Sequence, residues 1–516
     1  MTVRNPDRRH LLRAGGALSL LGAAAPFALQ LAAAGSAAGQ SAPDYKALVC
    51  IFLFGGNDAH NMVLATDTDS WGRYFATRNT GVDPIALMPV GTARTAVGAV
   101  SPVTGRTASL GTPEAWGGVL PITPTAPNPV PAGTNATSRT FALHPFMAPT
   151  QTLFNSGRLA IVANVGTLVR PITKAQYLAK SVAYPANLFS HNDQQSTWQA
   201  GAAEGVRVGW GGQFGDMLSS MNGSNTLFTA ISTAGNAVFL SGRNIIQYQM
   251  TTAAQPAVVV TGTTANSLFG STVGPARLRE IIQDTTSASL YAADYSTVVN
   301  RSMTAASTLN TAFTQTNVTA IPAPPAYTNA ITGAVEANTL ATQLQTVAKM
   351  IAANGTLGLK RQVFFVSLGG WDTHDKQNTT QPNLLAKVAQ AMSYFDGVLG
   401  NIGGQDMRAN VTTFTASDFS RTFTTNGDGT DHAWGGHHLV MGGAVKGKNI
   451  YGQYPTLGVD LGTFNNPDMA RTALVPTTSV DQYGATMGKW MGVSDTDLDT
   501  IFPNLRYFTP RYLNFL

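Results

Sequence analysis

KALVCIFLFGGND, residues 46–58, is the stretch that decides the fold. After Lys46 the eight residues 47–54 form an unbroken apolar run, which is typical of a strand buried on both faces of a parallel sheet. The run ends at once in GGND, a turn-forming sequence with two glycines. The sequence therefore predicts a central strand over residues 46–54 that delivers Asp58 to one edge of a sheet.

Three later stretches repeat this pattern. RLAIVANVG (158–166) and RQVFFVSLGG (361–370) are apolar, and NVTTFTASD (410–418) is a more polar version. Helical periodicity lies between the last strands: in residues 339–354 the apolar side chains recur at i, i+4, i+7 and i+11, and 383–400 is similar. Alternating helices and strands predict an α/β fold with a mostly parallel central sheet and helices on both faces.

Two regions depart from this alternation. Residues 90–140 are rich in Gly, Pro and Thr, and residues 250–330 are rich in Ala, Thr and Ser. The second contains a stretch with helical character (275–303) and a proline-rich linker (321–327). The chain has no internal repeat and no clear domain boundary. We therefore expect residues 41–516 to form a single large α/β domain with insertions near 90–140 and 250–330.

The first 40 residues have the features of an export signal. Arg8 and Arg9 precede an uncharged stretch rich in Ala, Gly and Leu, which ends in small residues near Ala34–Gln40. A basic start, an apolar middle and a small-residue end are typical of a secretory signal, and the arginine pair indicates the twin-arginine route. The alternatives are an ordinary helix or a retained membrane anchor. An anchor needs about 20 strongly apolar residues, whereas this stretch is diluted with Ala and Gly and interrupted by Pro26. We expect a cleaved signal and a periplasmic or secreted protein.

Composition narrows the function classes. Charged residues make up 11% of the 516 positions, well below the ~25% of an average domain. The formal charge of +5 falls to +2 beyond residue 40, because residues 1–40 hold four arginines and one aspartate. With no Lys/Arg block, we expect no nucleic-acid binding. Cys50 has no partner cysteine and lies in the apolar run, so it should be a buried thiol. No apolar stretch after the signal is long enough to span a membrane.

Polar side chains follow three of the four predicted strands. Asp58 follows the first, Asp372 and His374 follow the third, and Asp418 and Arg421 follow the fourth. A further segment, GDGTDHAWGGHH (427–438), adds more aspartates and histidines. Ligands of parallel sheets bind beyond the carboxyl ends of the strands, so these clusters should converge on one edge. Carboxylate and imidazole ligands suit Zn²⁺, Mn²⁺ or a similar divalent cation. The alternative is structural, with the aspartates forming turns and helix caps.

The order of these motifs resembles a known family. GGND, GGWDTH, SDFSRT and a late DH before a strand resemble the exported family catalogued as domain of unknown function 1501, over most of residues 45–455. That family is grouped with the alkaline-phosphatase-like superfamily, which includes phosphatases and sulfatases. The resemblance implies an alkaline-phosphatase-like α/β sandwich with metal ligands at strand ends. It implies no substrate.

The resemblance also implies metal ligands. Asp58 matches the first metal-binding aspartate of the superfamily. Asp372 and His374 match its central Asp…His pair, although the spacing here is tighter. His432 matches a late histidine, with His437 as an alternate.

A fifth ligand departs from the superfamily pattern. Asp418 matches the aspartate of an Asp-His pair, but Phe419 replaces the histidine, and a phenyl ring cannot ligate. We therefore expect unequal sites. The tight one has Asp372, His374 and His432 as ligands. The other is weak or absent and relies on Asp58 and Asp418, with Ser190 as an optional ligand.

The candidate catalytic residues are Ser190 and Arg421. The resemblance implies a Ser or Thr nucleophile at a helix start after the second strand, and NLFSHND (187–193) offers Ser190 there; a helix cap is an equally good interpretation. Its neighbour His191 is a further candidate ligand. Arg421 could clamp an anionic oxygen or serve only as a capping arginine. Together with the export signal, the resemblance implies as the leading hypothesis an exported metal-dependent hydrolase of phosphate or sulfate esters, whose substrate, a small molecule or a polymer, it does not specify. The alternative is a non-catalytic binding or cell-surface assembly protein.

Overall fold

A computed structural model describes residues 45–130, 137–223, 225–252, 260 and 262–516. The expected export signal, residues 1–40, lies outside the described residues. Residues 45–516 belong to one compact unit. Within the described part of the chain, no helix combines the length and apolarity needed to cross a membrane.

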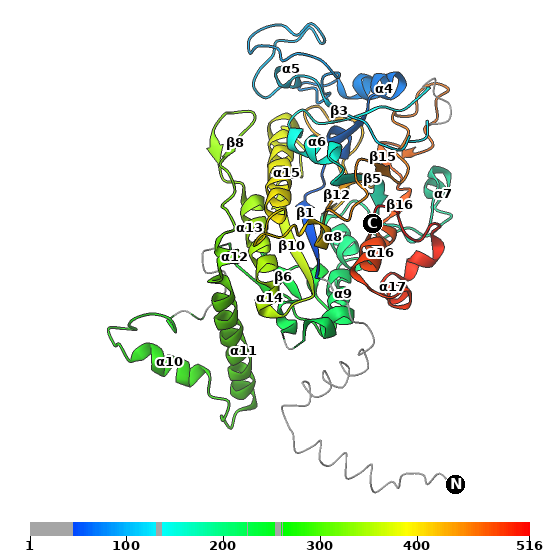
Figure 1. Cartoon of the computed structure of the whole chain (residues 1–516). Helices are drawn as coiled ribbons and strands as arrows, with labels where there is room; N and C mark the ends of the chain where they lie inside the picture. The colour runs from blue at the N-terminus through cyan, green and yellow to red at the C-terminus, as the bar shows by residue number, and fades with distance from the viewer. Residues whose placement is uncertain (1–44, 131–136, 224, 253–259, 261) are drawn as a thin grey trace, which may run out of the picture. The chain divides into compact units, whose positions relative to one another are not determined.

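A nine-stranded sheet forms the centre of the unit, with the order β13-β5-β12-β11-β1-β10-β6-β7 and β16 added beside β5 (Figure 1). β1 (Lys46–Phe54) lies in the middle, parallel to β10 (Arg361–Gly369) and to β11 (Val411–Ser417). β12 (Gly436–Met441) runs antiparallel between β11 and β5 (Leu159–Gly166). The remaining strands join in parallel: β6 (Ala230–Ser232), β7 (Tyr248–Gln249), β13 (Ile450–Tyr451) and β16 (Thr478–Ser479). The four predicted strands and the mostly parallel sheet are confirmed.

The side chains of β1 alternate between two hydrophobic cores. Ala47, Val49, Ile51 and Leu53 belong to one, and Leu48, Cys50 and Phe52 belong to the other. Because helices cover both faces of the sheet, neither set of side chains meets water, which explains the unbroken apolar run. Cys50 is a buried free thiol, as expected.

Each core is closed by its own helices. One face of the sheet is covered by α6 (Ala148–Asn155), α13 (Thr339–Ala352), α15 (Gln377–Leu399) and the last turns of α11 (Leu290–Phe313). The other is covered by α8 (His191–Ala200), α9 (Trp210–Leu218), α16 (Val480–Met491) and α17 (Asp495–Ile501) (Figure 1). Both predicted helices are confirmed, and the second begins earlier, at Gln377. The chain is therefore an α/β sandwich with helices on both faces.

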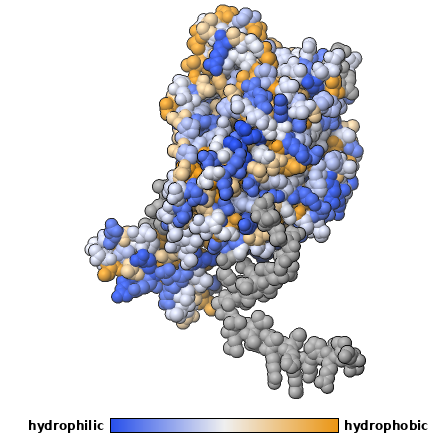
Figure 2. Space-filling model, in the orientation of Figure 1, coloured by the Kyte–Doolittle hydropathy of each residue, from blue (hydrophilic) through white to orange (hydrophobic). Residues whose placement is uncertain are grey.

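The first insertion contains few regular elements, whereas the described part of the second is mainly helical. In the described part of 90–140 these are α5 (Pro113–Trp116) and β3 (Leu120–Ile122), which joins β4 (Phe141–Leu143) and β2 (Val63–Ala65) in an antiparallel sheet. In 250–330, α10 (Gly274–Ile282) precedes the long α11. The shorter elements are α3 (Ala59–Met62), α4 (Thr68–Arg78), α7 (Lys174–Ala179), α12 (Thr316–Thr319), α14 (Asn354–Leu357), β8 (Tyr327–Thr328), β9 (Val335–Glu336), β14 (Met469–Ala470) and β15 (Ala473–Leu474). Hydrophilic and hydrophobic residues are interspersed over the visible surface, in keeping with the low charged fraction (Figure 2).

Candidate metal centre

The loops after β1, β10 and β11 meet at the carboxyl edge of the sheet. β12 runs antiparallel to β11. It therefore starts at this edge, and the segment that precedes it lies there too. The first two loops pass closely at Gly55, whose φ is +118°. A Cβ at this position would overlap the backbone nitrogen of Asp372. The turn therefore requires glycine, both for its backbone conformation and for the space it leaves.

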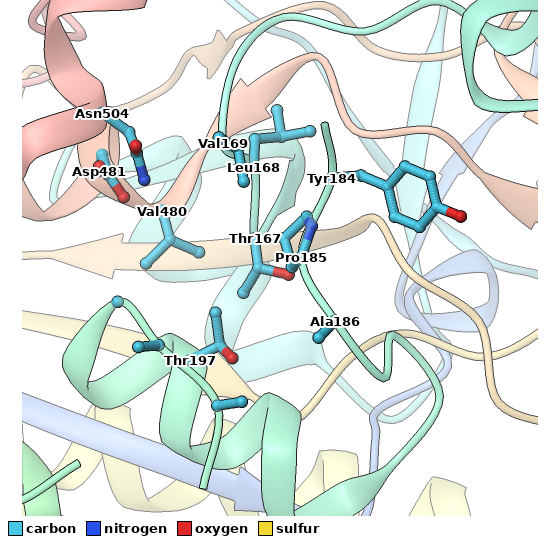
Figure 3. A pocket seen from close by; sticks show the side chains of 13 residues that line it. Thr167, Leu168, Val169, Tyr184, Pro185, Ala186, Thr197, Val480, Asp481 and Asn504 are labelled. Carbon is cyan, nitrogen blue, oxygen red and sulfur yellow. The ribbon is translucent and has the colours of Figure 1, made fainter. Parts of the chain in front are cut away.

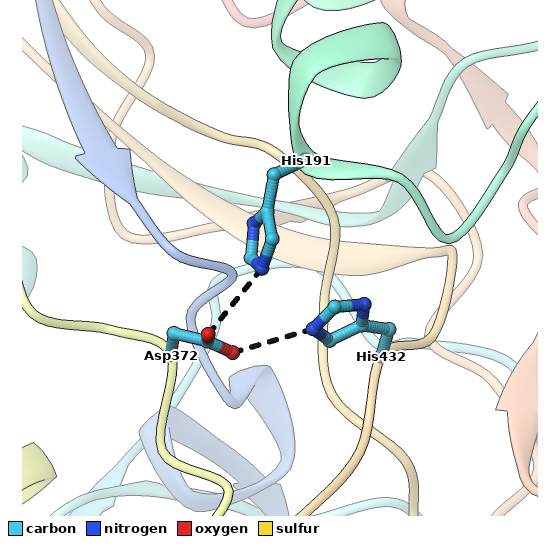
Figure 4. A group of neighbouring side chains, drawn as sticks. All are labelled: His191, Asp372 and His432. Atoms are coloured by element: carbon cyan, nitrogen blue, oxygen red, sulfur yellow. Dashed lines mark hydrogen bonds and ion pairs between the residues drawn. The ribbon is translucent and has the colours of Figure 1, made fainter.

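Three histidines converge on the carboxylate of Asp372. Nε2 of His374 and Nε2 of His432 lie 3.2 and 3.3 Å from Oδ1. Nε2 of His191, the first residue of α8, lies 3.4 Å from Oδ2. His191, Asp372 and His432 offer ligand atoms that all lie within 4.8 Å of one another (Figure 4). The side chain of Asp372 is 45% exposed, so a ligand can reach the group from solvent.

The hydrogen bonds on the far side of the rings indicate which nitrogens are free to ligate. Nδ1 of His432 lies 2.7 Å from the carbonyl oxygen of Phe189, which can only accept, so Nδ1 carries the hydrogen. Nδ1 of His374 faces Oδ1 of Asp431 at 3.1 Å. In the neutral rings both Nε2 atoms then present lone pairs, yet they lie 2.9 Å apart. Two facing lone pairs repel each other, and a shared cation removes that repulsion. The donor set therefore fits a metal ion.

His191 is oriented by a buried carboxylate. Its Nδ1 lies 2.6 Å from Oδ2 of Asp418. That oxygen also accepts from Nε2 of Gln195 at 2.9 Å and from the backbone N–H of Gly55 at 3.2 Å. The hydrogen bond that His191 donates to Asp418 raises the pKa of His191 against the opposing effect of burial. A carboxylate on the rear nitrogen of a ligating histidine fixes its tautomer and orientation, so Asp418 acts through His191.

Arg421 holds Asp372 in place. Nη1 donates to Oδ1 of Asp372 at 2.7 Å and to the carbonyl of Gly55 at 3.3 Å, and Nη2 donates to the carbonyl of Thr430 at 2.5 Å. Burial acts to raise the pKa of Asp372, but the hydrogen bond and charge of Arg421 lower it overall. The Arg421 side chain has no exposed surface. It therefore supports the candidate ligand and does not reach into solvent as an anion clamp.

Asp58 lies outside this cluster. Its carboxylate forms a fully buried ion pair with Arg78. Oδ1 accepts from Nη2 of Arg78 and the backbone N–H of His60, and Oδ2 accepts from Nη1 of Arg78 and Nε2 of Gln377. Four donors occupy the sites that a metal would use.

The remaining predicted residues flank the centre. Ser190 is the N-cap residue of α8, directly before His191, and a hydrogen bond from its hydroxyl lowers the pKa of Asp193. Phe419, in place of the superfamily histidine, packs its ring against His191 and His432 with centroids 4.9 and 4.6 Å apart.

For two histidines the structure changes which one is the better candidate ligand. His191, which the sequence offered as a further candidate ligand beside Ser190, lies next to Asp372; its signal was its place at a helix start after a buried strand. His437, the alternate to His432, is instead buried in β12, where Nδ1 accepts the backbone N–H of Asn164 at 3.1 Å. It faces the interior, stacked on Tyr454.

A match to the family described as "protein of unknown function (DUF1501)" spans residues 45–502. The chain belongs to the DUF1501 family. Among curated proteins, none matches this DUF1501 chain. One similar solved structure is a 2-O GAG sulfatase, with 10% identity, a TM-score of 0.23 and coverage of 68% of this chain. The match spans 66% of the sulfatase chain, just under two thirds. A TM-score this low supports no argument about fold or function.

Proposed function

We propose that this DUF1501 protein is a metal-dependent hydrolase of phosphate or sulfate esters, related to the alkaline-phosphatase-like superfamily. One observation carries the proposal: three imidazole Nε2 atoms converge on the half-exposed carboxylate of Asp372 at the carboxyl edge of a parallel sheet. Mixed imidazole and carboxylate ligands suit zinc or manganese. The open face of Asp372 leaves room for a substrate.

The chain's own residues have distinct roles in this proposal. His191, Asp372 and His432 would hold the ion, with His374 as a fourth ligand. When bound, a divalent ion supplies Lewis-acid chemistry to an ester oxygen. Asp418 keeps Nε2 of His191 free of hydrogen by accepting from Nδ1.

We infer one tight ion. A second site would need Asp58 and Asp418. The two carboxylate oxygens of Asp58 already accept hydrogen bonds from four donors. Asp418 keeps one oxygen, Oδ1, without a hydrogen-bond partner among the described residues. Any second ion would therefore be weakly held.

Ser190 is the proposed nucleophile. It immediately precedes His191 at the start of α8, so its backbone is fixed beside the centre. The positive end of a helix dipole stabilises the negative charge that develops on a serine oxygen. Ser190→Ala should then abolish ester cleavage and leave metal content unchanged.

A non-catalytic metal-binding protein is the second candidate, and the burial of Arg421 favours it. Phosphate and sulfate sites commonly use an arginine fork. Here that arginine is committed to Asp372 and two carbonyl oxygens, so a substrate anion would have to rely on the metal.

Activity assays separate the two candidates. Metal-loaded wild type should cleave aryl phosphate, phosphodiester or sulfate esters, and Asp372→Asn should not. Asp375→Asn is the matched control, because Asp375 is a neighbouring, largely exposed carboxylate. A broad ester panel with no cleavage above a chelator-treated sample, from protein that retains its metal, would favour the binding protein.

We further propose that the chain is exported through the twin-arginine route. The pathway reads a guanidinium pair and not charge alone. Arg8→Lys with Arg9→Lys should leave the protein in the cytoplasm. Arg4→Lys with Arg13→Lys, which makes the same substitutions outside the pair, should not. Normal export of the first variant would refute the proposal.

A further inference from the structure

A cavity of about 220 Å³ lies behind α8, apart from the metal centre. Its walls come from the end of β5 and the following loop (Thr167, Leu168), from α8 (Thr197), from the first turn of α16 (Val480, Asp481) and from Asn504. The volume is below the ~300–1,000 Å³ of drug-sized pockets, so it suits a small ligand.

Asp481 is the only charged residue that lines this cavity. It is 7% exposed. Among the described residues no lysine, arginine or histidine forms an ion pair with it, and its carboxyl receives support only from the backbone N–H of Asn504. Burial raises its pKa to about 7, against that hydrogen bond. A buried acid without a cationic partner is costly to ionise.

The position of Asp481 in the first turn of α16 explains why an aspartate is favoured there, but it does not explain why the side chain lines a cavity. Ser479 caps α16 and bonds the backbone N–H of Asp481, and an acid in a first turn favours the helix dipole. That benefit does not require a buried carboxyl. In the next helix, α17, the first-turn Asp495 is exposed to water.

The rest of the lining is uncharged. Leu168, Val169, Pro185 and Val480 contribute apolar surface. Figure 3 shows Asp481 and Asn504 at one side of the pocket and Tyr184 at the other. A ligand for this cavity would combine one positive group with a short hydrocarbon body.

We infer that this cavity binds a small alkylammonium compound, with the ammonium on Asp481 and the alkyl chain against Leu168 and Val480. Such a ligand supplies the counter-charge that the buried carboxyl lacks and adds hydrogen-bond donors to the backbone N–H of Asn504. The inference does not depend on the proposed ester hydrolysis, because no metal-centre residue lines the cavity.

The test uses three probes of matched length: n-butylammonium, n-butanol and butyrate. Each is titrated into the purified full chain at pH 8 by calorimetry. Butylammonium should bind saturably and at least about tenfold more tightly than butanol, and butyrate should not bind. Equal binding of the first two, or no binding of butylammonium, would overturn the inference, since water alone would then satisfy Asp481.

Variants locate the binding. Asp481→Asn should weaken butylammonium binding by at least about tenfold and leave butanol binding nearly unchanged. Asp495→Asn makes the same substitution in the first turn of the next helix, outside the cavity, and should bind like wild type. Should Asp481→Asn fail to fold, the comparison of the three probes on wild type still decides. Retained affinity in folded Asp481→Asn would contradict the assignment.

Discussion

Asp58 and Asp372 occupy equivalent places in the chain and have opposite surroundings. Each follows a Gly-Gly pair at the end of one of two adjacent parallel strands, and each is met by a buried arginine. Arg78 binds both oxygens of Asp58 and buries the pair completely. Arg421 takes only Oδ1 of Asp372 and leaves the other oxygen open towards His191.

The difference shows what turns a strand-end aspartate into a candidate ligand. Arg78 lies 20 residues from Asp58 and Arg421 lies 49 residues from Asp372. The glycine turn alone therefore does not determine whether the aspartate is buried in an ion pair or left open to a ligand. Arg78 also donates to the carbonyls of Thr422 and Phe423, so the Asp58 pair ties two loops together. We therefore expect Asp58 to stabilise the fold and Asp372 to bind the metal.

Removing Arg78 should have the largest effect. Arg78→Met leaves Asp58 buried without its counter-charge, which should cost about 3–5 kcal/mol in the free energy of unfolding. Urea denaturation of the metal-free protein measures the loss. Arg421→Met is the matched comparison and should cost less, because the side chain of Asp372 is 45% exposed to water. A loss below about 1 kcal/mol for Arg78→Met would remove the structural role assigned to the pair.

Weakening the support of the histidines should have a smaller effect. Asp418→Asn removes the carboxylate that orients His191, and a change of this kind lowers metal affinity by about 10–100-fold. Competition with a chelating dye measures it. Asp431→Asn should cost less, because its contact with His374 is longer, 3.1 Å against 2.6 Å. Equal affinities in wild type and Asp418→Asn would show that Asp418 does not act through His191.

Much of the framework was predictable from local pattern. The apolar runs within residues 46–54 and 361–370 predict buried strands, because both faces of such a strand must be apolar. The helical period of residues 339–354 predicts a helix that packs on the sheet. The convergence of Asp372, His374 and His432 follows from the rule that parallel strands deliver their loops to one edge.

The partner of each aspartate was not predictable. Arg78 ends a helix 20 residues after Asp58, and nothing in its local sequence marks it as a buried counter-ion. His191 reaches Asp372 only because α8 begins at the same edge of the sheet. Tertiary contacts of this kind decide which polar residues are satisfied internally, and one sequence does not encode them locally.

The smallest expected effect concerns a histidine that, like Asp58, is fully buried. Burial lowers the pKa of His144 to about 3, so the folded protein resists the proton that the unfolded chain takes up below pH ~6.5. The contribution of His144 should therefore destabilise the protein as the pH falls from about 6.5 towards 3, by at most about 1.4 kcal/mol per pH unit for this one group.

His144→Asn removes this effect and can keep an acceptor for the backbone N–H of Phe146. Between pH 7 and pH 5 the variant should lose about 1–2 kcal/mol less unfolding free energy than wild type, measured by urea denaturation. Its metal affinity at pH 7 should be unchanged, since His144 lies in the hydrophobic interior. An identical pH dependence in both proteins would show that His144 is protonated without penalty.

Elemental analysis of the folded protein tests the contrast between the two aspartates most directly. Wild type and Asp58→Asn should each retain one tightly bound transition-metal ion per chain after dialysis, although Asp58→Asn should unfold more easily. Asp372→Asn and His432→Ala should retain almost none, because each deletes a ligand. Two equally tight ions in wild type, or full metal content in Asp372→Asn, would contradict the assignment of Asp372 as the ligand and Asp58 as the structural partner of Arg78.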